Sequence, residues 1–255
     1  MLHLLKYVLH DLLRTRFVLL YAAFLFFSTA GMFQLEADPG KVALSLMNTL
    51  LIVTPLVSVV FTTIHFYNSY EFIELMLSQP LDRLRVFLAE YLAVALALCA
   101  AFLAGVGLPM LGFGVIGSGL TLLYSGVALT LAFVSLAFLA ASLTRDKAKA
   151  IGVALLFWLY FSLIYDAIVL WILYAFANYP LEKTTLVLVC LNPVDLARIL
   201  MVLQLDISAL MGYTGAFFRN FFGGSQGLAF TGAILLVWII VPLWLSMRIF
   251  KRKDL

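Results

Sequence analysis

Charged residues are scarce in this sequence. Only 11% of the 255 residues are Asp, Glu, Lys or Arg, while 65% are hydrophobic. Soluble domains carry about 25% charged residues, so the composition excludes a water-soluble globular protein and indicates an integral membrane protein. The net charge of +3 is small and gives no support to nucleic-acid binding.

The sequence also lacks the common motifs of nucleotide binding and hydrolysis. It contains no G-x-x-x-x-G-K-[ST] loop, so it does not bind ATP through a P-loop. It contains no H-E-x-x-H, no G-x-S-x-G and no clustered set of His, Cys and acidic residues. We therefore expect no catalytic residue, no cofactor and no metal site in this chain.

Cysteine is rare as well. Cys99 and Cys190 both lie in apolar stretches, and a single pair does not argue for a disulfide. We expect two unpaired structural thiols. The three histidines, His3, His10 and His65, fall on the opposite side of the predicted topology from Cys190, so they cannot join it in a metal site.

Long apolar runs dominate what is present. A membrane-spanning helix needs about 20 apolar residues, and the runs predict an all-α membrane protein with six such helices in one domain, residues 1–255. The expected spans are residues 17–35, 42–66, two helices between Glu90 and Arg145 with a break at 117–119, 150–177 and 228–247.

Residues 1–16 form an amphipathic pattern ahead of the first span. Apolar residues at helical spacing alternate with a polar face, which predicts a helix lying in the membrane interface. The small residues 28–30 resemble a signal-peptide cleavage site. We expect instead that the segment stays as an uncleaved first span.

A charged segment, residues 67–87, separates the second and third spans. Ionisable groups cost a few kcal/mol each in hydrocarbon, so this segment and the following Glu90 should lie in water or at the headgroup surface. We predict a short helix from Asn68 to Ser78, stopped by Pro80, with Asp82 capping the next helix. Rigidly joined to two spans, it could transmit force from an attached protein.

Basic residues predict the orientation of the six spans. The N-terminal segment, the charged segment, the turn at 145–149 and the C-terminal tail carry 12 of the 16 Lys and Arg residues. Because positive charge accumulates on the cytoplasmic side, both termini should be cytoplasmic, in a bacterial inner membrane. A seventh span at 184–205 would put the two termini on opposite sides of the membrane. It would also bury Asp195 with Arg198, so we do not expect one.

Residues 178–227 should lie on the outer side, yet they are too apolar for a solvated loop. Asn192 and Pro193, with Asp195 at the third helical position, predict a helix from 193 to about 204. We therefore expect a re-entrant or surface-lying helical segment between spans five and six. Its phenylalanines would dip into lipid or meet a partner: Phe217, Phe218, Phe221 and Phe222.

Asp166 is the single acid well inside a predicted span. Ser162, Tyr165 and Asp166 share a helical face, so the carboxylate could face a polar vestibule or a subunit interface. A structural hydrogen bond to a tyrosine or to another helix is the alternative. One acid without a second catalytic group does not make a hydrolase.

The topology and the segment EFIELMLSQPLDR, Glu71 to Arg83, together resemble the ABC-2 class of ABC transporter permeases over essentially the whole chain. The resemblance implies a homodimer bound to two cytoplasmic ATPases that carry Mg-ATP. It also implies that the charged segment is a coupling helix seated on the ATPase. The contact residues would then be Glu71, Glu74, Leu77, Pro80 and Arg83.

Two shorter motifs narrow the resemblance. Residues 164–166 (IYD) and 191–198 (LNPVDLAR) are similar to the permeases of nitrous-oxide reductase maturation systems. This similarity implies a NosF-like ATPase, a periplasmic NosD-like protein, a copper chaperone and a role in assembling copper centres for denitrification. Tyr165 and Asp166 would be intramembrane polar residues, and the outer partner would be met by Asn192, Asp195 and Arg198.

Three other functions stay open. A general ABC-2 exporter of lipid, glycan or drug needs the same coupling helix but no obligatory periplasmic partner. A secondary transporter would need more intramembrane charge than Asp166 supplies, and usually an internal repeat. A membrane enzyme would need paired catalytic groups.

Overall fold

The computed structural model describes residues 2–36, 38–77, 82–113, 119–177, 179, 182–204 and 225–252. Every regular element within these ranges is a helix, which confirms the predicted all-α class. Six helices or continuous helical runs are long and apolar enough to cross a membrane. The prediction of six spans is therefore confirmed, and the protein is a multi-pass membrane protein.

Four spans are each formed by one continuous α-helix: α2 (Arg16–Leu35), α3 (Pro39–Asn68), α7 (Gly119–Leu143) and α13 (Ser225–Arg252). The other two contain a π-helical turn: α5–η1–α6 (Arg83–Phe102, Leu103–Gly107, Leu108–Gly112) and α8–η2–α9 (Lys147–Leu159, Tyr160–Ile164, Tyr165–Ala175). The remaining helices are α1 (Leu2–Arg14), α4 (Tyr70–Leu77), α10 (Glu182–Cys190) and α11 (Pro193–Gln204).

Aspartates fix the starts of two spans. The Asp38 carboxylate accepts a hydrogen bond from the backbone N–H of Gly40 at 2.9 Å, and Pro39 occupies the first turn of α3. The Asp146 carboxylate accepts from the N–H of Ala148 at 2.8 Å at the start of α8. Both satisfy backbone groups that a helix N-terminus otherwise leaves without partners.

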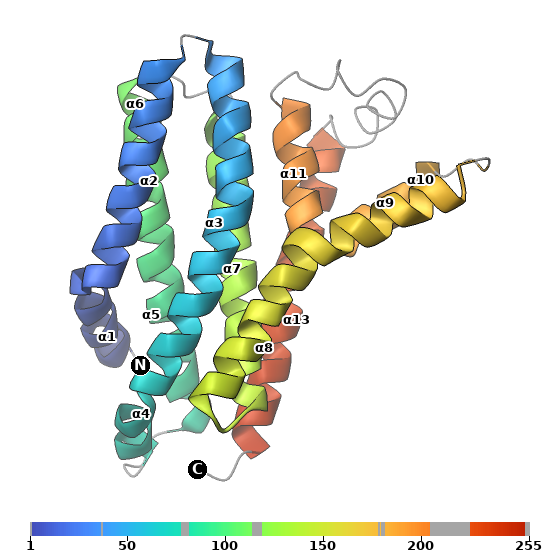
Figure 1. The fold of residues 1–255 in the computed structure, drawn as a ribbon. Coiled ribbons are helices and arrows are strands. Elements are labelled where there is room, and N and C mark those ends of the chain that lie inside the picture. Colours follow the sequence, from blue (N-terminus) through green and yellow to red (C-terminus); the bar gives the residue numbers. More distant parts are fainter. Residues whose placement is uncertain are drawn as a thin grey trace.

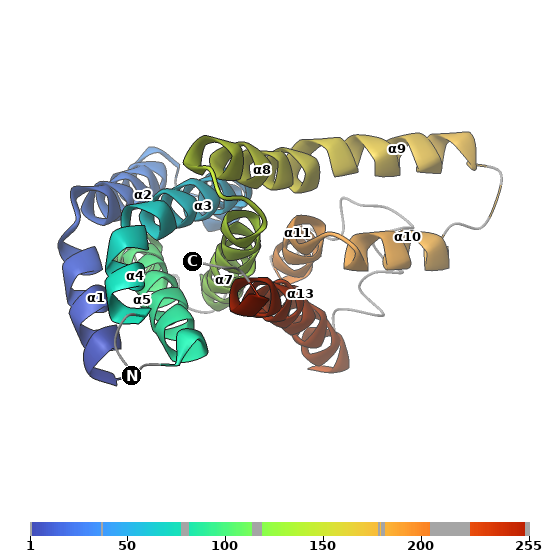
Figure 2. The ribbon, with the colours of Figure 1, turned by 90° about the horizontal axis from the view of Figure 1, so that it is seen from below.

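Helix α7 is the centre of the bundle. It packs against α3, α5, α8, α11 and α13, and Figure 2 shows it between α3 and α8 on one side and α11 and α13 on the other. Its side chains from Ala132 to Phe138 are almost entirely buried. A helix that is apolar all round is suited to this central position.

Four phenylalanines join the spans below the centre of the bundle. Phe66 of α3, Phe87 of α5, Phe138 of α7 and Phe250 of α13 are all buried. The ring centroids of Phe66 and Phe138 lie 5.5 Å apart, and those of Phe87 and Phe250 lie 4.9 Å apart. These offset and edge-on contacts hold four spans together near the end at which α4 lies.

The basic segments gather at one end of the molecule. Figure 1 shows α1, α4, the α7–α8 turn and the C-terminal end of α13 at this end, with the α2–α3 turn and α11 toward the other. In α1, Val8 and Leu12 are buried, and Lys6, His10 and Arg14 are exposed. The helix therefore has the two faces that the sequence predicts, and its position in the interface remains a prediction.

The charged segment differs from the sequence prediction in three details. Its short helix spans Tyr70–Leu77, because Asn68 still belongs to α3. Asp82 precedes α5 as predicted, but its carboxylate pairs with Arg85 Nε at 2.8 Å and caps no backbone N–H. Glu90 does not face water: its side chain is 2% exposed, because it lies two turns into α5 and faces α3.

Several predicted features fall outside the described residues. They are Pro80, Gly117 and Ser118 of the predicted break, and Phe217, Phe218, Phe221 and Phe222. The backbones of Glu74 and Leu77 belong to α4, but their side chains also lie outside the described part of the chain.

Candidate functional site

Helix α4 is a short two-sided element at the basic end of the bundle. Ile73 is 1% exposed and packs in the core, whereas Glu71 is exposed. Arg83, just beyond α4 at the start of α5, is exposed as well. Of the five residues predicted to contact an ATPase, the structure thus places Glu71 and Arg83 on the surface.

The end of α3, which leads directly into α4, is tied to α5 and to the α7–α8 turn. At the end of α3, Tyr67 Oη donates to the carbonyl of Thr144 at 3.0 Å, and Lys147 Nζ donates to Asn68 Oδ1 at 2.7 Å. His65 Nε2 lies 3.2 Å from Glu90 Oε2. A displacement of α4 would therefore reach α3, α5 and the α7–α8 turn together.

The pairing of His65 with Glu90 was not predicted from the sequence. These residues are 25 positions apart on two spans, and only the packing of α3 against α5 brings them together. The one available signal is that Glu90 directly precedes the long uncharged run that ends at Arg145.

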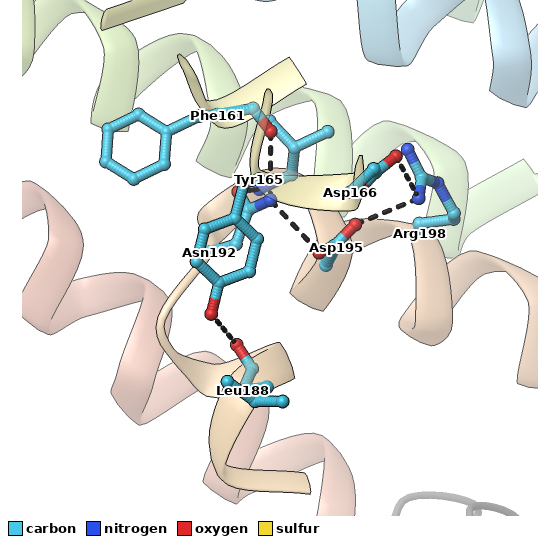
Figure 3. A network of polar contacts seen from close by, with 8 residues as sticks. Phe161, Tyr165, Asp166, Leu188, Asn192, Asp195 and Arg198 are labelled. Carbon is cyan, nitrogen blue, oxygen red and sulfur yellow. Dashed lines mark hydrogen bonds and ion pairs between the residues drawn. The ribbon is translucent and has the colours of Figure 1, made fainter. Parts of the chain in front are cut away.

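A second polar site joins α9 to α11 (Figure 3). Arg198 Nη1 lies 2.9 Å from Asp166 Oδ2 and 2.9 Å from Asp195 Oδ1. The sequence predicted Asp166 and the pair Asp195 and Arg198 as two separate sites. The structure brings them into one ion-pair cluster, with Arg198 between the two carboxylates.

Asn192 holds this cluster in place. Its Oδ1 accepts from the N–H of Val194 at 2.9 Å, which caps α11 at the predicted residue. Its Nδ2 donates to Asp195 Oδ2 at 3.0 Å and to the carbonyl of Phe161 at 2.9 Å. The buried amide therefore connects the start of α11 to the fifth span.

The π-helical turn η2 presents the Phe161 carbonyl. Backbone hydrogen bonds in a π-helix span five residues, and such turns occur often at functional sites. The Tyr165 N–H bonds to the carbonyl of Tyr160, and Tyr165 Oη donates to the carbonyl of Leu188 in α10 at 2.6 Å. The fifth span is thus joined to both α10 and α11, and nothing in the sequence pattern indicated η2.

The charges of the cluster do not cancel when both acids are ionised. Two carboxylates face one guanidinium, and the Asp195 side chain is only 10% exposed. Opposite charges attract more strongly in such a low-dielectric environment than in water. The cluster borders a cavity of about 250 Å³ that Val169 and Leu170 also line. We call Asp166, Asp195 and Arg198 the ionic clamp, because the two ion pairs of Arg198 hold α9 and α11 together.

The chain turns sharply just before α11, which carries two of the three clamp residues. Residues 184–190 of α10 and 193–202 of α11 are bent by 112° relative to each other. By length and composition this bent pair is either a re-entrant segment, as predicted between spans five and six, or a broken seventh span. The re-entrant segment therefore stays a prediction. The hydrogen bonds of Asn192 lie at the bend, so this residue orders the turn.

No metal centre is found in the described part of the chain. No group of three or more His, Cys, Asp and Glu side chains there could hold an ion. Cys99 and Cys190 are free thiols.

Comparison with known proteins gives one family and two named relatives. A family model described as ABC-2 family transporter protein matches residues 71–255, from α4 to the end of the chain. A probable ABC transporter permease protein NosY from Stutzerimonas stutzeri is 26% identical over 200 residues, covering 70% of this chain and 67% of the relative. The protein of the same description from Pseudomonas aeruginosa is 27% identical over 197 residues, covering 71% and 68%.

Proposed function

Because this chain is a permease subunit of the ABC-2 family of transporters, we propose that a separate cytoplasmic ATPase drives it by acting on α4. The observation that carries this proposal is the position of α4 at the basic end of the bundle. Lys and Arg mark the cytoplasmic side, so both termini and α4 face the cytoplasm, where ATP is available.

The contacts at the base of α4 give the proposed mechanism. The ATPase binds Mg-ATP and seats on α4 through Glu71, Glu74, Leu77, Pro80 and Arg83. Its rearrangement during hydrolysis tilts α4. The bonds from Tyr67 to Thr144 and from Lys147 to Asn68 carry that motion to the α7–α8 turn, and His65 with Glu90 carries it to α5.

More narrowly, we propose that the permease is of the Nos type and works as a homodimer in a bacterial inner membrane. Two relatives described as NosY and the motifs at 164–166 and 191–198 support this assignment. The partners would be a NosF-like ATPase, a periplasmic NosD-like protein near α11 and a copper chaperone. The permease would then relay ATP-driven motion to the assembly of nitrous-oxide reductase.

Affinity purification in mild detergent, with mass spectrometry of the captured proteins, tests both levels of the proposal. An ATPase subunit with a P-loop is expected in either case. A periplasmic NosD-like protein or a copper chaperone in addition supports the Nos type, and an ATPase alone supports a general exporter of lipid, glycan or drug. Reproducible capture without an ATPase would contradict the proposal.

Charge reversal at α4 tests the proposed contact. The paired substitutions Glu71→Lys and Glu74→Lys should lower co-purification of the ATPase and permease-dependent hydrolysis by about tenfold or more, the loss of roughly 1.4 kcal/mol or more of contact energy. Membrane insertion should not change. Glu36→Lys, at the other end of the bundle, is the control and should behave as wild type. Full retention of ATPase binding in the double variant would exclude α4 as the contact.

A further inference from the structure

A polar cavity lies beside the base of α4, far from the ionic clamp. It has a volume of about 220 Å³ and is enclosed by α1, the junction of α3 with α4, and α5. Asp11, His65 and Glu90 supply its titratable groups, and Tyr7 and Phe72 supply aromatic rings. These side chains belong neither to the predicted ATPase contact nor to the ionic clamp.

One oxygen in the lining of this cavity lacks a hydrogen-bond donor. Glu90 is 2% exposed, and its Oε2 lies 3.2 Å from His65. Its Oε1 is buried and accepts no hydrogen bond from any residue that the structure describes. A buried acceptor without a partner destabilises the folded protein. A ligand that brings N–H groups would remove this destabilisation.

The negative charge of the cavity lining favours a cationic ligand. Two carboxylates, Asp11 and Glu90, face a single imidazole. The rings of Tyr7 and Phe72 are stacked with centroids 6.4 Å apart, and Tyr7 is 69% exposed. Aromatic faces attract cations, so this pair favours the entry of an ammonium group into the cavity.

The positive charge of Lys147 next to the cavity favours a ligand that carries both a positive and a negative charge. Lys147 Nζ is held by Asn68 Oδ1 at 2.7 Å, and Asn68 belongs to the cavity lining. A ligand with an ammonium group inside and a phosphate outside would satisfy both the carboxylates and Lys147. A Lys or Arg side chain from a partner protein would bring no anion for Lys147.

We propose that this cavity binds the headgroup of a membrane phospholipid with a primary ammonium group. The ammonium enters between Asp11 and Glu90 and donates to Glu90, and the phosphate lies against Lys147. The amphipathic α1, which forms one wall, has the two faces typical of a helix at headgroup depth. The site does not depend on the identity of the ATPase or of any outer partner.

The test uses the full-length protein reconstituted in vesicles of phosphatidylethanolamine and phosphatidylcholine in equal amounts. After extraction in mild detergent, native mass spectrometry counts the lipid of each kind that stays bound. A quaternary ammonium has no N–H to donate, so the comparison isolates the hydrogen bond to Glu90. Wild type should retain the ethanolamine lipid with about tenfold preference, a difference of roughly 1.4 kcal/mol.

Conservative variants tie this preference to the cavity. Glu90→Gln and Asp11→Asn should reduce the preference severalfold, because the amide that replaces each carboxylate still accepts a hydrogen bond but carries no charge. Glu36→Gln, at the far end of the bundle, should keep it. Circular dichroism checks that each variant is folded. Equal retention of the two lipids by wild type, or an unchanged preference in folded Glu90→Gln, would overturn the proposal.

Two further arms distinguish the source of the ammonium group. Soluble phosphoethanolamine, at the concentration of the lipid, should fail to displace the lipid, and displacement would overturn a lipid site. Loss of ATPase capture in Glu90→Gln together with an unchanged lipid preference would assign the cavity to a basic side chain of the partner, and would also overturn it.

Discussion

At the scale of single residues, Arg198 bridges two acids that lie on different helices, α9 and α11. It lies 2.9 Å from a carboxylate oxygen on each side. Removing a charge from a partly buried cluster leaves its partners uncompensated, and this costs more than the pair contributes. Arg198 compensates two acids, whereas each acid compensates only Arg198.

Substitution at the clamp should therefore be asymmetric. Arg198→Met should lower the stability of the folded protein by about 1.5–3 kcal/mol, the value of hydrogen bonds to charged groups. Asp166→Asn should cost less, because Arg198 keeps Asp195 as its partner. Thermal unfolding in mild detergent, followed by size-exclusion chromatography, measures the difference.

The double variant and a surface control complete this series. Adding Asp166→Asn to Arg198→Met should restore part of the lost stability, because one of the two facing carboxylates is then neutral. Arg14→Met, at an exposed position on α1, should have almost no effect. A loss in Arg198→Met no larger than in Asp166→Asn would contradict the bridging role.

The residues of the clamp could be predicted from the sequence, but their pairing could not. Asp166 stands out as an acid within a span, and Asn192 with Pro193 indicates a helix start. Asp195 and Arg198 are three positions apart, so their contact is local. The contact of Arg198 with Asp166 depends on how α11 packs against η2 and α9, and no local pattern reports that packing.

At the scale of helices, the two π-helical turns adapt the third and fifth spans to their neighbours. Gly105, within η1, lies against α2 so closely that a Cβ there would be 2.6 Å from Leu25 Cβ and 2.9 Å from the carbonyl of Ala22. The carbonyl belongs to the backbone of α2, so the whole helix would have to shift. Small residues permit this kind of close helix contact in membranes.

Two glycine substitutions test the role of close packing. Gly105→Ala should destabilise the protein by about 1–3 kcal/mol, the usual cost of overpacking. A Cβ at Gly152 in α8 would meet nothing within 4 Å, so Gly152→Ala should be neutral or stabilising by up to about 1 kcal/mol, because alanine favours the helix. Thermal unfolding of both variants in the same detergent measures the contrast. Equal effects would show that the α2–η1 contact does not limit stability.

Helix positions followed from the sequence where local chemistry sets them. α11 spans Pro193–Gln204, as Asn192 and Pro193 predict, and the six apolar runs give the six spans. The prediction that Glu90 lies in water is wrong because α5 packs its second turn against α3, and no local pattern reports that packing. The turns η1 and η2 were missed because π-helical geometry is set by packing between spans.

At the scale of the whole molecule, one end of the bundle carries the features expected of a cytoplasmic face. α1, α4, the α7–α8 turn and the end of α13 lie together there, and these segments hold most of the Lys and Arg residues. The end of α3, next to α4, is joined there to α5 and to the α7–α8 turn. Driving the bundle from α4 requires that this face meets the cytoplasm.

Cysteine labelling in spheroplasts measures that orientation directly. In a variant with Cys99 and Cys190 replaced by alanine, Glu71→Cys should react with a membrane-impermeant maleimide only after the membrane is permeabilised. Glu36→Cys, between α2 and α3 at the opposite end, should react in intact spheroplasts. Labelling of Glu71→Cys in intact spheroplasts, with Glu36→Cys protected, would place α4 outside and contradict an ATPase-driven α4.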